Sequence, residues 1–177
     1  MACALTQGRA IDCRNSMGGI EQVLISEFSD ITAYTEANGI ITAMTQAAKS
    51  FYIYELEKEN GSLIETHTGS LENGSNFYDS VLEFSTFNLS ADESEEISLL
   101  DQSQLFIIVK DNNGIYWSMG ASRAADKLGG TSVTGAAFGD MNGYTYTFTA
   151  KEPQRMFQVD ATTISGSDRI IWLCDNF

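Results

Sequence analysis

The sequence is dominated by short runs in which apolar and polar residues alternate, and Asn-Gly pairs separate several of these runs. The clearest run is 143–150, where Tyr144, Tyr146 and Phe148 alternate with threonines. Successive side chains of a β-strand point to opposite faces, so this pattern predicts a strand with one face in a core. Asn-Gly pairs favour the tight turns that join antiparallel strands. The chain is therefore expected to fold mainly as antiparallel sheet.

Similar runs with turn residues between them predict the rest of the sheet. Turns are predicted at Asn38-Gly39, Asn60-Gly61 and Asn73-Gly74, and the segment Asp111–Gly114 predicts a hairpin turn rather than half of a calcium-binding loop. Strands are expected at residues 20–28, 30–34, 39–45, 51–57, 62–68, 76–88, 104–110, 115–120, 143–150, 156–160 and 169–174.

Two segments have patterns that bear on assembly. In 76–88 one face carries Tyr78, Leu82 and Phe84, and the other face is also partly apolar. We expect both faces to be partly covered, the second one by a neighbouring subunit. Residues 121–142 are rich in Gly, Ala and Ser and are predicted to form a long loop. Deleting residues 124–138 is then expected to leave a folded subunit that cannot polymerise.

One segment near the middle has the pattern of a helix. Ser90 precedes Glu93 by three residues, which is the spacing of a capping box with reciprocal hydrogen bonds. The acidic residues that follow Ser90 suit the positive end of a helix dipole, and Ile97 and Leu100 share one stripe. These residues predict a helix at 91–102.

These elements predict an α+β fold, mainly antiparallel β: a β-sandwich or small barrel with one flanking helix. The 177 residues are expected to form a single domain, with an N-terminal arm (1–19), the long loop (121–142) and a C-terminal extension (161–177). The opening residues lack the apolar stretch of a secretory signal, and no segment has the roughly 20 apolar residues of a membrane span. We expect no membrane association and free thiols in a reducing cytoplasm.

Residue types that commonly support catalysis are scarce. The chain has one His and three Cys without CxxC spacing, and it has no phosphate-binding glycine motif. His67 is a candidate general base only if Cys3 or Cys13 folds near it, with Glu65 on the same face. Asp79 and Glu83 point the same way along one strand, but no substrate groove follows from that. We predict no catalytic, metal or cofactor site, and a small Cys–His hydrolase is the enzymatic alternative.

The formal net charge of −14 argues against sequence-specific nucleic-acid binding, since an acidic protein repels phosphates. Acidity has two other uses, which the sequence does not separate. It keeps a concentrated protein soluble, and it suits the wall of a channel past which DNA slides without sticking.

Several stretches resemble one family. These are MACALTQGRAIDCRNSMGGI at the start, ENGSNFYD and the acidic helix in the middle, then LFIIVKDNNGIYWSMG and GDMNGYTYTFTAKE. They resemble structural proteins of tailed phages that infect Bacteroidetes, and the likeness to tail tube subunits runs through most of residues 1–160. The resemblance implies a β-sandwich with a flanking helix that forms rings, usually hexameric. It also implies that the rings stack into a hollow tube in the virion, assembled in the cytoplasm of the bacterial host.

We therefore expect a non-enzymatic tail tube subunit whose partners are copies of itself and other tail or neck proteins, with DNA passing unbound. Asp79, Glu83, Thr145 and Thr147 are expected to face the lumen. Contacts between rings are expected from the arm and the long loop, at Cys3, Arg14, Ala121, Arg123, Leu128 and Phe138. The alternative within the same class is a neck or connector ring, or a capsid decoration protein.

Overall fold

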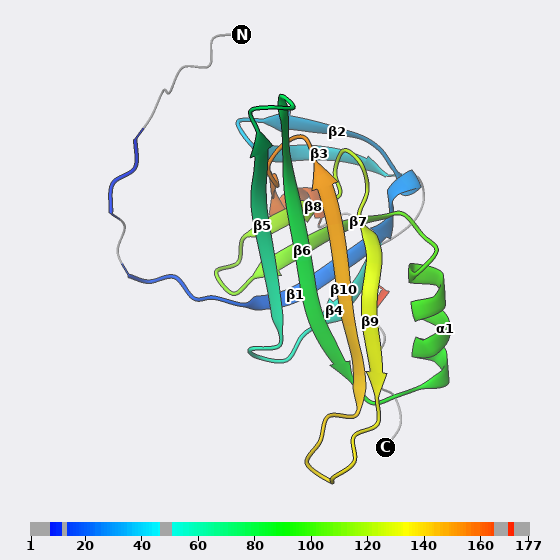
Figure 1. The fold of residues 1–177 in the computed structure, drawn as a ribbon. Helices are drawn as coiled ribbons and strands as arrows, with labels where there is room; N and C mark the ends of the chain where they lie inside the picture. Colours follow the sequence, from blue (N-terminus) through cyan, green and yellow to red (C-terminus); the bar gives the residue numbers. More distant parts are fainter. Residues whose placement is uncertain (1–7, 12–13, 47–50, 165–169, 172–177) are drawn as a thin grey trace.

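The computed structural model describes residues 8–11, 14–46, 51–164 and 170–171. Its strands form two sheets that pack face to face, with a helix at one edge (Figure 1). The larger sheet has eight strands in the order β12-β4-β1-β7-β8-β11-β3-β2, and the smaller has four in the order β5-β6-β10-β9. Neighbouring strands are antiparallel except for the pairs β11–β3 and β12–β4. The prediction of a mainly antiparallel α+β sandwich is confirmed.

The bounds of the elements follow the predicted segments closely. The larger sheet comprises β1 (Ile20–Glu27), β2 (Ile31–Ala37), β3 (Ile40–Gln46), β4 (Tyr52–Glu55), β7 (Leu105–Asp111), β8 (Tyr116–Met119), β11 (Gln158–Val159) and β12 (Ile170–Ile171). The smaller sheet comprises β5 (Gly61–Ser70), β6 (Ser75–Phe87), β9 (Asp126–Val133) and β10 (Gly143–Glu152). The helical segments are the short 3-10 turn η1 (Phe28–Asp30), α1 (Ala91–Leu100) and α2 (Ala161–Ile164).

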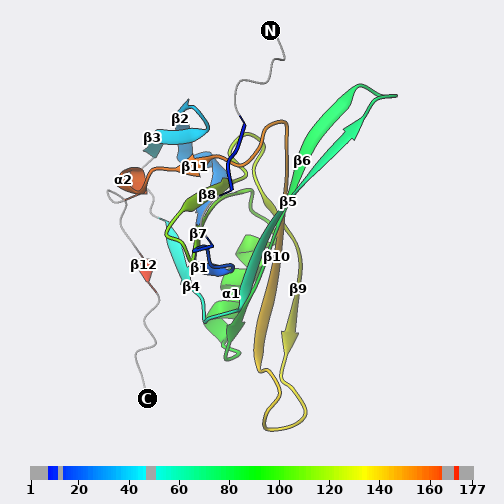
Figure 2. The ribbon, with the colours of Figure 1, turned by 90° about the vertical axis from the view of Figure 1, so that its left-hand side faces the viewer.

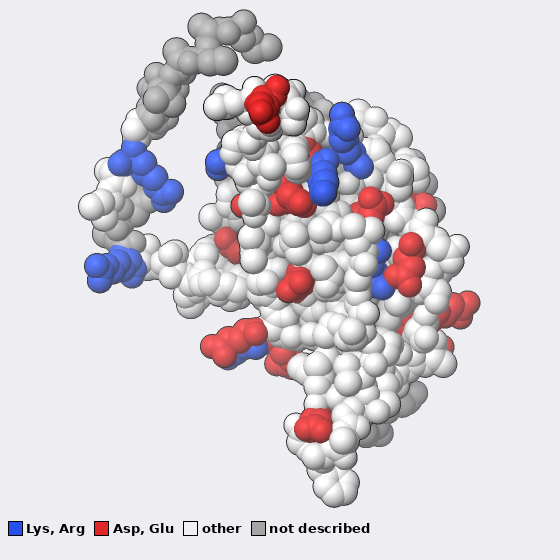
Figure 3. All heavy atoms as spheres, viewed as in Figure 1, with Lys and Arg blue, Asp and Glu red and all other residues white. Residues whose placement is uncertain are grey.

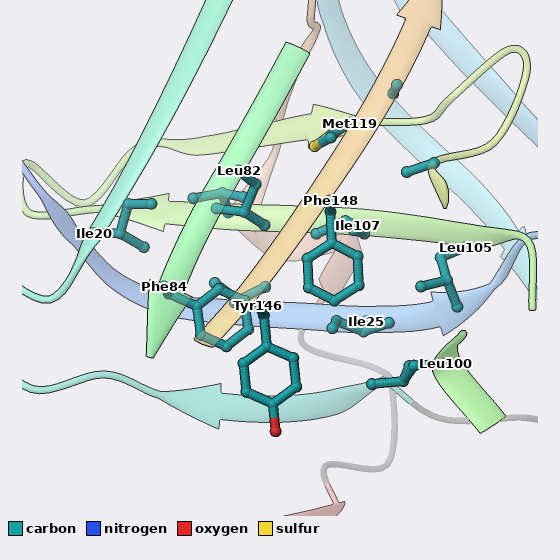
Figure 4. Packing of buried hydrophobic residues seen from close by; sticks show 14 of the residues in the cluster. Ile20, Ile25, Leu82, Phe84, Leu100, Leu105, Ile107, Met119, Tyr146 and Phe148 are labelled. Carbon is teal, nitrogen blue, oxygen red and sulfur yellow. The ribbon is translucent and has the colours of Figure 1, made fainter. Parts of the chain in front are cut away.

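The main core lies between the two sheets (Figure 4). β10 contributes Tyr146 and Phe148, which lie against Ile25 and Ile107 of the larger sheet. The ring of Phe84 in β6 stacks on that of Tyr146, with centroids 4.9 Å apart. The alternation predicted for residues 143–150 is therefore correct, and it decides which face of the smaller sheet is covered.

A second apolar cluster covers the opposite face of the larger sheet. It includes Leu24, Phe106 and Ile108, whose neighbours along the same strands belong to the main core. Figure 2 shows β2, β3, β11 and α2 on this side, away from the smaller sheet. β1 and β7 are consequently buried on both faces, which explains why residues 105–109 are continuously apolar.

The helix α1 begins at its predicted cap, but only half of the capping box forms. The Ser90 hydroxyl accepts a hydrogen bond from the backbone N–H of Glu93 at 3.1 Å. The Glu93 carboxylate instead accepts from the Tyr146 hydroxyl at 2.7 Å and from the Thr86 hydroxyl at 2.5 Å. Glu93 thus anchors the helix to the smaller sheet, and the helix ends at Leu100 rather than at residue 102.

The prediction of a loop over 121–142 is wrong for residues 126–133, which form the edge strand β9. Gly129 and Gly130 give this segment low strand propensity, but its backbone pairs with β10 along the whole strand. Gly130 lies against the Thr145 carbonyl oxygen, where a Cβ would come within 2.6 Å. Deleting residues 124–138 would therefore remove an edge strand and the buried Ala124 and Ala125. The predicted folded deletion product is no longer expected.

Both ends of the described chain lie outside the sandwich. Residues 8–11 and 14–19 lead into β1 as an extended arm (Figure 1). The root of the arm is held by the β7–β8 turn, where Asn113 Nδ2 donates to the Met17 carbonyl at 2.8 Å and Asn112 Nδ2 to that of Gly18 at 2.6 Å. Of the C-terminal extension 161–177, the structure describes α2 and β12 only.

Candidate assembly surface

The outer face of the smaller sheet collects the four residues predicted to line a lumen. Asp79 and Glu83 come from β6, and Thr145 and Thr147 come from the adjacent strand β10. Glu83 lies directly opposite Thr147 in the ladder. All four side chains alternate with core residues, so they point away from the larger sheet. The tertiary structure thus brings together on one face residues that the sequence separates by more than sixty positions.

Hydroxyl groups dominate the middle of this face. Thr145 Oγ1 accepts from the backbone N–H of Thr131 in β9 at 2.9 Å, and the two threonine hydroxyls lie 2.7 Å apart. Beside them is a shallow hollow of about 460 Å³, lined by Glu59, Glu83, Thr147 and neighbouring residues. The hollow is open and contains two carboxylates without a cation beside them, so its chemistry repels anions.

Few charged groups lie on the outer face. Asp79 Oδ2 is 3.9 Å from the Lys151 ammonium, whose charge also lies 5.8 Å from the centre of the Phe77 ring. Figure 3 shows this side of the molecule as mostly uncharged with scattered acidic groups. Such a surface offers phosphates hydroxyl contacts but little electrostatic attraction.

Exposed apolar side chains are concentrated on the smaller sheet and its connections. In the described part of the chain, the large hydrophobic residues that are exposed outside the N-terminal arm and α1 all belong to this sheet or its turns: Ile64, Leu71, Phe87, Leu128, Val133 and Phe138. The strands of the larger sheet contribute none to that set. Soluble monomers tolerate single exposed apolar residues, but a concentration on one sheet is typical of an interaction surface.

The residues predicted to form contacts between rings have varied positions. Leu128 is exposed on β9 and Phe138 is exposed at the tip of the β9–β10 loop. Arg14 lies exposed in the arm, and Arg123 lies exposed in the turn before β9. Ala121 is buried in the second apolar cluster, so its prediction as a contact residue is wrong. Cys3 lies outside the described residues.

Asp140 organises the loop that carries Phe138. Its Oδ2 accepts hydrogen bonds from the backbone N–H groups of Ala136 at 2.9 Å and Ala137 at 2.8 Å. These bonds stabilise the ionised carboxylate and hold the pKa of Asp140 below its ordinary value. Gly135 has a positive φ of 68°, which lets the chain turn tightly against Asp140. The exposed phenyl ring is therefore presented by an ordered loop.

Two glutamates lie on the inner face of the same sheet, near its end. Glu152 is buried and accepts a hydrogen bond from the backbone N–H of Ser122 at 2.6 Å. Glu65 accepts from the N–H of Met156 at 2.6 Å. Burial raises the pKa of Glu152, hydrogen bonds from Ser122 and Arg123 oppose the shift, and the charge of Glu65 adds to it. Both carboxylates are used to hold the chain segments that connect the sheets.

The predicted candidates for chemistry do not form a catalytic group among the described residues. His67 is exposed on β5, where its ring contacts Tyr78 and its Nε2 bonds to the Asn76 side chain. Glu65 shares its strand face but is bonded to Met156. The three cysteines lie outside the described part, so the structure does not test a Cys–His pair.

A larger hollow of about 490 Å³ lies between the sheets on the β5 side, lined by Ile20, Leu63, Trp117, Arg155 and others. Within the described residues no group of His, Cys, Asp and Glu side chains could hold a metal ion, and no helix is long and apolar enough to span a membrane.

The chain was compared with protein-family models, curated proteins and solved structures, and none of them matches it. The functional argument therefore depends on the fold and on this surface.

Proposed function

We propose that the chain is a phage tail tube subunit that assembles with copies of itself into stacked rings, with the outer face of the smaller sheet lining the bore. The observation that carries the proposal is the common orientation of Asp79, Glu83, Thr145 and Thr147 on one solvent-facing sheet surface. The antiparallel sandwich and flanking helix also agree with the fold that the sequence resemblance implies.

The chemistry of this face suits the passage of DNA without retention. Thr145 and Thr147 present neutral hydroxyls, and Asp79 and Glu83 repel phosphates at short range. Lys151 is the basic residue nearest to this belt, and its charge is directed to Asp79 and the Phe77 ring. A wall of this kind releases a polyanion because few counterions are displaced when DNA touches it.

The shape of the smaller sheet is compatible with closure between copies. β5 pairs with β6 from Phe84 to Ser75, whereas β9 reaches from the level of Phe87 only to that of Val81. The two edge strands are thus staggered, and such a stagger is what a sheet needs to close into a barrel with tilted strands. In the described part of the chain, β5 has no strand on its outer side, and β9 contacts other strands only through β10 and a bridge at Ala125.

One end of β9 is protected against edge pairing. A bulge interrupts its ladder with β10 near Lys127, whose side chain is turned inward over the Tyr146 ring and paired with Asp101. Bulges and inward charges are common devices that limit unwanted strand addition. We therefore expect strand contacts between copies at the regular part of β9, from Gly129 to Val133.

The test is negative-stain electron microscopy of the purified protein over a range of concentrations, together with sedimentation velocity. Rings with a central hole that stack into tubes are the expected result. A single layer of rings at every concentration would favour a neck or connector ring instead. A monomer at every concentration, or one that binds only to capsid shells, would contradict the tail tube proposal.

The lining of the bore has a test of its own. Thr147→Lys adds a cation to the outer face without touching the core, and tubes of this variant are expected to retain double-stranded DNA at low salt. Lys58→Ala, in the exposed β4–β5 turn, is a matched surface control that changes charge elsewhere. If tubes form and Thr147→Lys does not change DNA retention, this face does not line the bore.

A further inference from the structure

The two ends of the smaller sheet have complementary apolar features. At one end Leu71 lies fully exposed in the turn between β5 and β6. At the other end Phe87 and Val133 are exposed on the outer face. β6 has 13 residues, so it separates these ends by about 40 Å at 3.3 Å per residue. One copy can therefore offer one end to a neighbour while its other end stays available.

The far end has the form of a slot. Phe87 and Val133 are each paired with Gly143, which lies between them in β10. Neighbouring strands are about 4.8 Å apart, so the two apolar side chains stand about 10 Å apart over a residue without a side chain. That gap is wide enough to receive one aliphatic side chain from another molecule. A Cβ on Gly143 would come within 2.0 Å of the Thr86 carbonyl oxygen, so the glycine is required there.

The near end has the form of a projecting knob. β10 pairs with β6 only as far as Tyr78, so the hairpin beyond that level has no third strand beside it. Figure 2 shows the hairpin leaning away from the larger sheet, toward the side of the outer face. Lys151 lies 5.8 Å from the centre of the Phe77 ring and Arg155 lies 5.4 Å from that of Tyr78, and the two cations brace the base of the hairpin. The hairpin thus holds Leu71 where the outer face of a second copy can meet it.

We infer that Leu71 of one copy inserts between Phe87 and Val133 of a second copy. The contact is heterologous, because the knob and the slot are different parts of the same chain. Head-to-tail contacts of this kind do not close on themselves when successive copies are related along one direction, and they produce open stacks. The inference rests on the proposed tail tube function and names the contact that joins one ring to the next.

The experiment is a mixed cross-linking assay between two single-cysteine additions. Leu71→Cys protein and Val133→Cys protein are mixed under assembly conditions and oxidised, so that a disulfide between positions 71 and 133 can form only between copies. Disulfide formation needs Cα atoms less than about 7 Å apart, which makes the assay specific for close contact. A mixture of Leu71→Cys with Leu99→Cys is the matched control, because Leu99 is an exposed leucine on α1. Wild-type protein measures the background from the native cysteines.

We expect cross-linked dimer from the 71–133 mixture well above both controls. A second variant, Leu71→Asp, is expected to stay folded, since Leu71 is fully exposed, and to raise the concentration needed for stacking about tenfold or more. Leu99→Asp is its control.

The outcomes separate the two proposals. If tubes form but the 71–133 mixture gives no more dimer than the controls, the knob-and-slot contact is wrong and the tail tube function stands. If Leu71→Asp stacks as readily as wild type, the contact is equally contradicted. If the wild-type protein never assembles, both proposals fail.

Discussion

The two sheets of this sandwich are built for different tasks. The central strands of the larger sheet are buried on both faces, with Ile107 facing the smaller sheet and Ile108 facing the second apolar cluster. The smaller sheet buries Tyr146 and Phe148 on one face and leaves the other in contact with solvent. Side chains on the larger sheet therefore supply stability, whereas those on the outer face of the smaller sheet are free to serve an interaction. We expect mutations in the two places to have separable effects.

The largest effect is expected from a matched pair of isoleucines. Ile107→Ala removes a side chain that is 0% exposed and is expected to lower the free energy of unfolding by about 2–5 kcal/mol. Ile64→Ala removes one that is 58% exposed on the outer face and is expected to cost about 0.5 kcal/mol or less. Urea denaturation at a concentration where the protein is monomeric measures both. Equal losses would show that the outer face is part of the stabilising core.

A pH-dependent effect is expected where the sheets are joined. The Glu152 pKa is raised in the folded protein, so its carboxylate costs stability at neutral pH. As the pH falls through the raised pKa toward the ordinary value of about 4.3, the folded state takes up a proton first and that cost disappears. Glu152→Gln keeps an acceptor for the Ser122 N–H and never carries the charge.

The measurement compares the unfolding free energies of wild type and Glu152→Gln between pH 7 and pH 4.5. We expect the variant to gain on wild type at pH 7 and to lose that advantage at the lower pH. Glu83→Gln, a substitution of the same kind on the outer face of the same sheet, is the control. An advantage that does not change with pH would mean that the buried charge is not its source.

The smallest effect is expected in the exposed loop of the smaller sheet. Asp140→Ala removes the acceptor for the Ala136 and Ala137 N–H groups and is expected to speed chymotrypsin cleavage after Phe138 a few-fold, with little change in global stability. Because the Asp140 pKa is lowered, its hydrogen bonds persist above the ordinary value of about 3.9 and are lost as the pH falls through the lowered one. Amide chemical shifts of Ala136 and Ala137 measure that titration in wild type.

Asp126→Ala, an exposed carboxylate on the neighbouring strand, is the control for the cleavage assay. If Asp140→Ala is cleaved at the wild-type rate, the loop owes its order to other contacts.

Local patterns were sufficient for most elements of the fold. The alternation of Tyr144, Tyr146 and Phe148 assigned β10 to the surface of a core, and Ser90 marked the start of α1, because both signals depend on near neighbours in the chain. β9 was missed because Gly129 and Gly130 have low strand propensity, and only the backbone of β10 makes the strand favourable there. The Glu93 side chain was misassigned for a similar reason, since its partners Tyr146 and Thr86 lie in two other elements.

The candidate surface was predictable in part. Alternation placed Asp79 with Glu83, and Thr145 with Thr147, on common faces of their own strands, but the pairing of β6 with β10 was needed to unite the two pairs. The slot formed by Phe87, Gly143 and Val133 has no signal in the sequence, because its three residues come from three strands. The burial of Ala121 likewise depends on a distant cluster.

The order of residues along the chain determined the strands, the turns and the helix cap, since each is decided by side chains within a few positions of one another. Tertiary packing alone decided which sheet is covered on both faces, which edges are left unpaired and which side chains meet across strands. The physical reason is that burial and strand pairing are properties of the space between segments, and no local pattern records which segment will occupy that space.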